Sequence, residues 1–238
     1  SSTSSQSTRS DLISTQREGE SEEESDNEEA DWGGWSDPLA QTFRSSKVGG
    51  EMVTKIDAFF QRKDKDIPVL CQIREVKNGF PTIKQLPFAG KYLSPYMKGL
   101  VKMSAGGTTV TGNGTDFLTG THNLKVGDTI TIQGLGSQTS GIAVDTNNYD
   151  ASALVAKVTA INSETELVVD TAATSGTSNF DKKISNINLS DDASTPTTFR
   201  FDAPIYIKEE TDYALVLHTP CETYFAWISR MGELDIGG

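Results

Sequence analysis

The sequence has few of the residues that metal sites and disulfide frameworks require. Its 238 residues include two histidines, His122 and His218, and two cysteines, Cys71 and Cys221. Neither histidine has a cysteine or a second histidine at the spacing of a zinc site. Cys71 lies inside an apolar stretch, where a free thiol packs as a small hydrophobic side chain. We therefore expect no metal centre, no disulfide framework and structural roles for both histidines.

Long apolar runs and catalytic motifs are also missing. No run reaches the roughly 18 apolar residues of a membrane-spanning helix, and no signal peptide opens the chain. Neither a G-x-S-x-G elbow nor a phosphate-binding glycine loop of standard spacing occurs. Residues 145–150 bring oxygen ligands together but lack the glycine and glutamate of a calcium loop. We expect no enzyme, cofactor or membrane insertion, although carboxylates on separate strands could still pair for glycoside hydrolysis.

Basic residues are absent from the strongly acidic N-terminal segment. The net charge is -12, and ten acidic side chains lie between residues 18 and 37 with no lysine or arginine among them. The remainder is nearly neutral and has no concentrated basic patch, which argues against nucleic-acid binding. Residues 1–31 contain hardly any apolar side chain. Residues 1–35 are therefore predicted to be an acidic, low-complexity arm that is disordered or ordered only by a partner.

Four apolar side chains beside this arm are candidates for partner binding. Trp32 and Trp35 follow the acidic residues and are separated by two glycines, and Leu39 and Phe43 follow the Asp37-Pro38 step. Aromatic residues next to a flexible charged tract are typical anchors in a partner's groove. In the alternative, the tryptophans fold back onto their own domain. Leu39 and Phe43 could equally tie the arm to that domain.

From residue 52 onward the sequence has the pattern of short strands. Val69, Cys71 and Ile73 alternate with Gln72 and Arg74, as in a half-buried antiparallel strand. A charged turn at 61–66 precedes this strand, and an Asn-Gly turn at 78–79 follows it. Residues 198–207, 213–219 and 224–230 read as three further strands. No stretch shows the 3.6-residue apolar period of a helix, so the chain is predicted to be all-β.

The middle of the chain has a composition of its own. Residues 103–183 are rich in Gly, Thr, Ser and Asn and poor in aromatic residues and proline. Their strand candidates could bury a separate small core of Val126, Ile130, Ile132, Leu154, Val158, Ile161, Leu167 and Val169. We therefore predict an inserted small β-domain at 103–183. It would interrupt a discontinuous, jelly-roll-like antiparallel β-sandwich formed by residues 36–102 and 184–236.

Several motifs of the predicted sandwich occur in a recognisable order. They are DPLAQTF at 37–43, TKIDAFF at 54–60, IPV at 67–69, QIR at 72–74, NGFP at 78–81, LPF at 86–88, LSDDAS at 189–194 and YALVL at 213–217. This order resembles a β-sandwich module of tail and baseplate proteins in T4-like contractile-tailed bacteriophages. The resemblance covers nearly all of 36–100 and 185–234.

A second resemblance lies in the inserted region. TVTG at 109–112, DF at 116–117, LKVGDTI at 124–130 and VTAINS at 158–163 are similar to a small β-barrel repeat of phage tail and fibre proteins. Together the resemblances imply a non-catalytic structural component of a tail baseplate, at the wedge, and one segment of a longer polypeptide. They imply a virion location after assembly in the host cytoplasm. Its partners would be other tail and baseplate proteins in a large oligomeric assembly.

The aromatic residues keep a second function open, a host-glycan-binding module of a receptor-binding or adhesin-type protein. Six of them could supply a stacking platform, namely Tyr92, Tyr96, Tyr206, Tyr213, Tyr224 and Trp227. Most occupy strand positions, however, where packing in a core is the commoner use of an aromatic side chain. Exposure of Tyr92, Tyr96, Tyr206 and Trp227 in one groove would favour this function.

Overall fold

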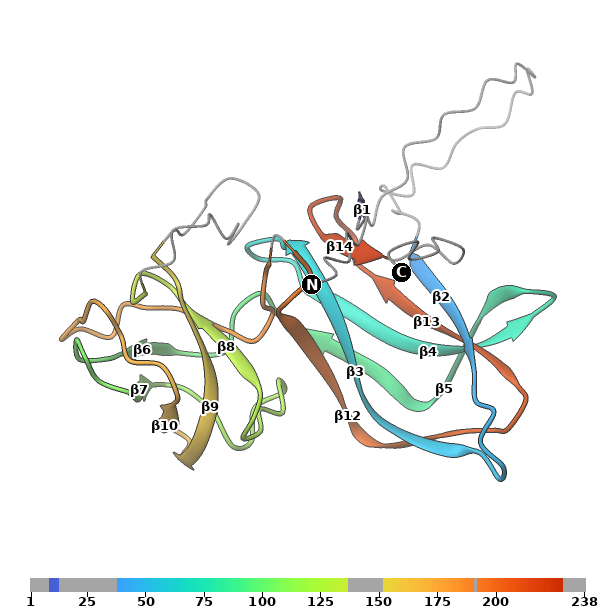
Figure 1. The fold of residues 1–238 in the computed structure, drawn as a ribbon, viewed down its shortest axis with the longest axis horizontal. Coiled ribbons are helices and arrows are strands. Elements are labelled where there is room, and N and C mark those ends of the chain that lie inside the picture. Colours follow the sequence, from blue (N-terminus) through green and yellow to red (C-terminus); the bar gives the residue numbers. More distant parts are fainter. Residues whose placement is uncertain (1–8, 13–37, 137–151, 191, 229–238) are drawn as a thin grey trace, which may run out of the picture.

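A computed structural model describes residues 9–12, 38–136, 152–190 and 192–228, and all its regular elements are β-strands. The strands form three sheets in which every pair of neighbours is antiparallel (Figure 1). The predicted all-β class is therefore confirmed. Among the described residues there is no helix long and apolar enough to cross a membrane.

Two four-stranded sheets form the sandwich. The order in the first sheet is β1 (Arg9–Leu12), β14 (Phe225–Ile228), β3 (Glu51–Arg62) and β12 (Pro196–Ile207). The order in the second is β2 (Leu39–Arg44), β13 (Asp212–His218), β4 (Val69–Lys77) and β5 (Phe80–Leu93). One apolar cluster lies between them, with Phe60, Val69, Cys71, Ile73, Leu93, Phe199, Ile207 and Tyr224 at its centre. Segments from before residue 94 and after residue 186 thus share one interior.

Strand β4 follows the alternation that its sequence predicts. Val69, Cys71 and Ile73 have no exposed surface, and burial raises the pKa of the Cys71 thiol. Gln72 and Arg74 are half-buried on the other face, where the Arg74 Nε–H donates to Gln72 Oε1 at 2.9 Å. The turn that follows has the positive φ angles expected of Asn-Gly, 54° at Asn78 and 83° at Gly79.

The middle of the chain forms a six-stranded sheet that nearly closes into a barrel. Its order is β11 (Ile184–Ser185), β8 (Thr129–Ile132), β9 (Leu154–Ser163), β10 (Glu166–Val169), β7 (Thr109–Asn113) and β6 (Leu100–Lys102). The two edges meet where Val101 N–H donates to the Lys182 carbonyl at 2.8 Å and Lys182 N–H donates back at 3.2 Å. A second apolar cluster, including Val101, Val110, Phe117, Ile130, Ile132 and Leu167, lies inside this barrel.

Three expectations about the inserted region need correction. Strands β6 and β11 belong to the barrel sheet although the sequence analysis assigned their residues to the sandwich. Val126 is 62% exposed because it lies in the turn closed by Asp128 N–H and the Lys125 carbonyl, where strand alternation does not apply. Ile161 is only partly buried. The other six predicted core residues are buried, from Ile130 to Val169.

Strand β5 was not predicted beyond the turn at residue 79. It contains two prolines, Pro81 and Pro87, which weaken the sequence signal of a strand. The strand continues past them because its pairing with β4 shifts register between Gln72 and Val76, and Phe88 adopts a φ of 62°. As the last strand of its sheet, β5 tolerates prolines that lack a backbone donor.

We predict that Ile73→Asp abolishes cooperative folding of the sandwich. An unpaired carboxylate at this fully buried position costs at least about 4 kcal/mol, most of the stability of a small domain. Thermal unfolding followed by circular dichroism measures the effect. The matched control is Ile83→Asp on β5, where the side chain is 96% exposed and the melting temperature should not change. Equal melting temperatures for both variants would mean that the wrong face of β4 was assigned to the core.

Candidate functional site

The chain passes twice between the two cores, and both passages meet in a buried junction. The incoming segment (residues 94–99) follows β5, and the outgoing segment (residues 184–190) leads from the barrel back to the sandwich. Every residue of the outgoing segment is buried. Met97 N–H donates to the Ile184 carbonyl at 2.8 Å and joins the two segments directly.

Lys63 lies at the centre of this junction. Its side chain is 1% exposed, and its ammonium donates to the Pro95 carbonyl at 2.7 Å and to Ser185 Oγ at 2.6 Å. The same ammonium lies 4.4 Å from the centroid of the Tyr96 ring. A buried charge is tolerated only when such partners replace its hydration. Lys63 was predicted to lie in a charged turn, yet this lysine links the incoming segment to the outgoing one.

Asn188 makes the second connection between barrel and sandwich. Its amide Nδ2 donates to the Thr129 carbonyl of β8 at 2.8 Å and to the Pro196 carbonyl of β12 at 2.9 Å. Its Oδ1 accepts a bond from Thr131 Oγ1 at 3.0 Å. One buried amide therefore binds a barrel strand and a sandwich strand at the same time.

Two further side-chain pairs cross the junction. Arg200 Nη2 of β12 donates to Asp128 Oδ1 of the barrel at 2.5 Å, and both side chains are mostly buried. His122 Nδ1 lies 2.5 Å from Asn186 Oδ1 in the outgoing segment. Burial lowers the pKa of His122, and the bond to Asn186 opposes that shift. The histidine is thus structural, and the junction fixes how the two domains are oriented.

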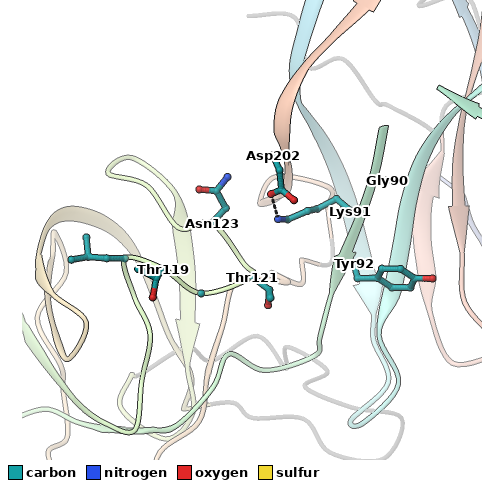
Figure 2. A pocket seen from close by; sticks show the side chains of 9 residues that line it. Gly90, Lys91, Tyr92, Thr119, Thr121, Asn123 and Asp202 are labelled. Carbon is teal, nitrogen blue, oxygen red and sulfur yellow. Dashed lines mark hydrogen bonds and ion pairs between the residues drawn. The ribbon is translucent and has the colours of Figure 1, made fainter. Parts of the chain in front are cut away.

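An open cleft lies beside the junction. Its volume is about 510 Å³, and the barrel loop 118–123 faces strands β5 and β12 across it (Figure 2). The Lys91 ammonium pairs with Asp202 Oδ1 at 2.7 Å on the sandwich side. Tyr92 belongs to the same rim, but its ring points away from the barrel loop.

The six aromatic residues do not form a single exposed platform. Tyr213 and Tyr224 are buried in the sandwich. The ammonium groups of Lys63 and Lys183 lie 4.4 and 4.6 Å from the centroid of the Tyr96 ring. Trp227 is half-buried and donates its indole N–H to the Ser190 carbonyl at 2.8 Å. Only Tyr92 and Tyr206 of the six are largely exposed, and they lie in different sheets.

Of the four candidate partner-binding residues, the structure describes two and leaves two outside the described residues. Leu39 and Phe43 are half-buried and pack against the sandwich core, with the Phe43 ring 6.2 Å from that of Tyr213. They therefore anchor β2 to its own domain, where β2 pairs with β13. Trp32 and Trp35 lie outside the described residues, as do residues 13–37 and the 145–150 segment.

Exposed apolar side chains that the sequence analysis missed lie on the sandwich. Phe80 and Ile83 of the β4–β5 hairpin are 75% and 96% exposed. Val48 and Met52 are 86% and 62% exposed, and Met52 opposes Tyr206 in the β3–β12 register. In Figure 1 the hairpin projects from the end of the sandwich opposite the six-stranded sheet. We call Val48, Met52, Phe80, Ile83 and Tyr206 the distal apolar residues.

Comparison with known proteins finds no matching family model, no matching curated protein and no matching solved structure. Within the described residues, no three His, Cys, Asp or Glu side chains gather where they could hold a metal ion. The site must therefore be interpreted from its own geometry.

We predict that Lys63→Met lowers the free energy of unfolding by about 2 kcal/mol, because it removes the charge-assisted hydrogen bonds of the ammonium to the Pro95 carbonyl and the Ser185 hydroxyl. Residual dipolar couplings should also show a changed orientation between barrel and sandwich. Lys98→Met, an exposed lysine of the incoming segment, is the control and should change neither quantity. Unchanged stability and orientation in Lys63→Met would show that the ammonium does not support the junction.

We predict that the protein loses stability below pH 6.5, the ordinary pKa of histidine, because folding lowers the pKa of His122. The unfolded chain then binds a proton that the folded chain does not, so falling pH favours unfolding. Urea unfolding across this range measures the slope, which His122→Gln should flatten. His218→Gln should have a smaller effect, because His218 is only partly buried and its pKa is also lowered. A slope unchanged in His122→Gln would contradict the assignment.

Proposed function

We propose that the chain is a structural module of a contractile-tail baseplate of a T4-like phage, at the wedge. It acts as a rigid spacer whose two ends contact different neighbours. The sequence motifs at 37–43, 67–69, 72–74 and 189–194 support the family, and those of the inserted region support a tail or fibre role. Its partners are other tail and baseplate proteins in a large assembly, and its place is the virion after assembly in the host cytoplasm.

The observation that carries the proposal is the position of the distal apolar residues. Large apolar side chains exposed to water, such as those of Phe80 and Ile83, are typical of protein–protein contacts. Phe80 and Ile83 sit beside a two-residue turn, on a hairpin that projects from the body. The buried junction holds the barrel at the other end. A neighbour bound to the hairpin would therefore be kept at a fixed distance and angle from the barrel.

A catalytic role is not part of the proposal. The partly buried Asp64 carboxylate serves local structure. Asp64 accepts bonds from the backbone N–H groups of Asp66 and Ile67, each at 2.8 Å, and from Thr223 Oγ1 at 2.7 Å. Those backbone bonds and the bond from Thr223 hold the pKa of Asp64 below its ordinary value against the effect of burial. A carboxylate used in this way supports a turn.

Mass spectrometry of purified tail particles tests the assignment. Peptides of this chain should be recovered from the particles in a fixed ratio to other tail proteins. Cross-links from Lys77 and Lys84, which flank the hairpin turn, should lead to a different protein. Absence of the chain from purified particles would overturn the proposed function.

Substitution of the hairpin tests its role separately. Phe80→Ser with Ile83→Ser should reduce incorporation of the protein into particles by about tenfold or more, because buried anchors contribute about 2 kcal/mol or more to an interface. The melting temperature should stay unchanged, since both side chains are exposed. Val126→Ser, at a 62% exposed apolar position in the barrel, is the control. Normal incorporation of the double variant would refute the hairpin contact.

A further inference from the structure

The cleft between the domains has the size of a ligand site. Its volume of about 510 Å³ falls in the range of roughly 300–1,000 Å³ of small-molecule sites. The lining comes from both domains: Gly90, Lys91, Tyr92 and Asp202 of the sandwich and Leu118, Thr119, Gly120, Thr121 and Asn123 of the barrel. Polar and apolar atoms contribute to its lining about equally, whereas most such sites are mainly apolar.

The barrel wall of the cleft is held in place before any ligand arrives. Glu164 Oε2 accepts bonds from the backbone N–H groups of Leu118 at 2.9 Å and Thr119 at 3.3 Å. Gly120 N–H donates to the Asp116 carbonyl at 2.7 Å, and a Cβ at this glycine would lie only 2.5 Å from that oxygen. His122 fixes the same loop from behind through Asn186. A wall fixed in this way loses little entropy on binding.

The sandwich wall carries a charged side chain on a face of β5 that is otherwise apolar and buried. Lys91 lies on the inward face of β5 between Ala89 and Leu93, which are fully buried. Its side chain is 7% exposed and meets the Asp202 carboxylate, which is 74% exposed, at 2.7 Å. A buried ammonium is tolerated only when such a partner replaces part of its hydration. Here the pair places an ammonium at the base of the cleft and a solvent-facing carboxylate at its edge (Figure 2).

We propose that this cleft binds a neutral, hydroxyl-rich ligand, a sugar unit of a glycan. The Asp202 carboxylate accepts hydrogen bonds from sugar hydroxyls, and the Lys91 ammonium and Asn123 amide donate to sugar oxygens. Thr121 adds a hydroxyl that can donate or accept. Leu118, 49% exposed, offers an apolar contact for the C–H face of the ring.

The balance of charge in the cleft selects against anionic ligands. Lys91 and Asp202 neutralise each other at 2.7 Å, so a phosphate would have to compete with Asp202 for the ammonium. This site differs from an aromatic platform, because the Tyr92 ring points away from it. The inference is independent of the baseplate assignment, since the binding experiment uses the purified chain and needs no phage particle.

Proton–nitrogen correlation NMR on the purified chain tests the proposal. The probes are methyl α-mannopyranoside, methyl β-galactopyranoside and methyl α-glucopyranoside, each titrated to millimolar concentrations and beyond. At least one should shift the amide signals of residues 118–123 and Asp202 with a saturable dependence. No saturable shift with any of the three would overturn the proposal. The proposal would also be overturned if inorganic phosphate shifted these signals and the glycosides did not.

Two variants assign the binding to the cleft. Asp202→Asn should weaken binding about tenfold or more, because bonds to a charged acceptor are the stronger ones. Thr121→Val keeps the shape of an exposed side chain and should weaken binding by less. Asp66→Asn, an exposed carboxylate outside the cleft, is the control. Equal affinities for Asp202→Asn and Asp66→Asn would show that the sugar binds elsewhere.

Discussion

The fixed geometry of this protein depends on one buried ammonium group at a double chain crossing. Lys63 follows the end of β3. Its ammonium donates to the Pro95 carbonyl of the incoming segment and to the Ser185 hydroxyl of the outgoing segment. Backbone carbonyls at such a crossing lie outside any regular ladder and need donors. For the Pro95 carbonyl, Lys63 and the Ser185 hydroxyl both supply one, each at 2.7 Å. The two apolar cores are thereby joined through directional polar bonds, with Asn188 and the Arg200–Asp128 pair acting in the same way.

The junction also explains how a complete barrel can be inserted into a sandwich. The barrel sheet begins with β6 and ends with β11, and residues 101 and 182 pair across the gap between these edges. The barrel therefore starts and finishes at neighbouring points, as a domain placed within a loop must. Each core is a separate apolar cluster. The sandwich keeps both its sheets although about one hundred residues lie between β5 and β12.

A fixed orientation is what the proposed roles of the surface require. The β4–β5 hairpin and the barrel lie at opposite ends of the sandwich, so a neighbour bound to the hairpin would be held apart from the barrel by a rigid body (Figure 1). The cleft exists for the same reason, because its walls belong to different domains. Were the barrel free to swing, Asn123 and Asp202 would not face one space. The proposed role as a spacer and the shape of the cleft thus depend on the same set of buried polar bonds.

The sequence by itself determined the strand class, the alternation of β4, the Asn-Gly turn and the separate core of the inserted region. These features follow from local chemistry, namely side-chain period, turn residues and a change in composition. Only the tertiary structure decided that Lys63 is buried, that Leu39 and Phe43 anchor β2, that Val126 is exposed and that β6 and β11 join the barrel. The partners of Lys63 lie 32 and 122 residues away along the chain. A local sequence pattern contains no information about such distant contacts. For this reason Lys63, which the local pattern predicts to be a solvated residue of a charged turn, proves to be buried in the junction between the two domains.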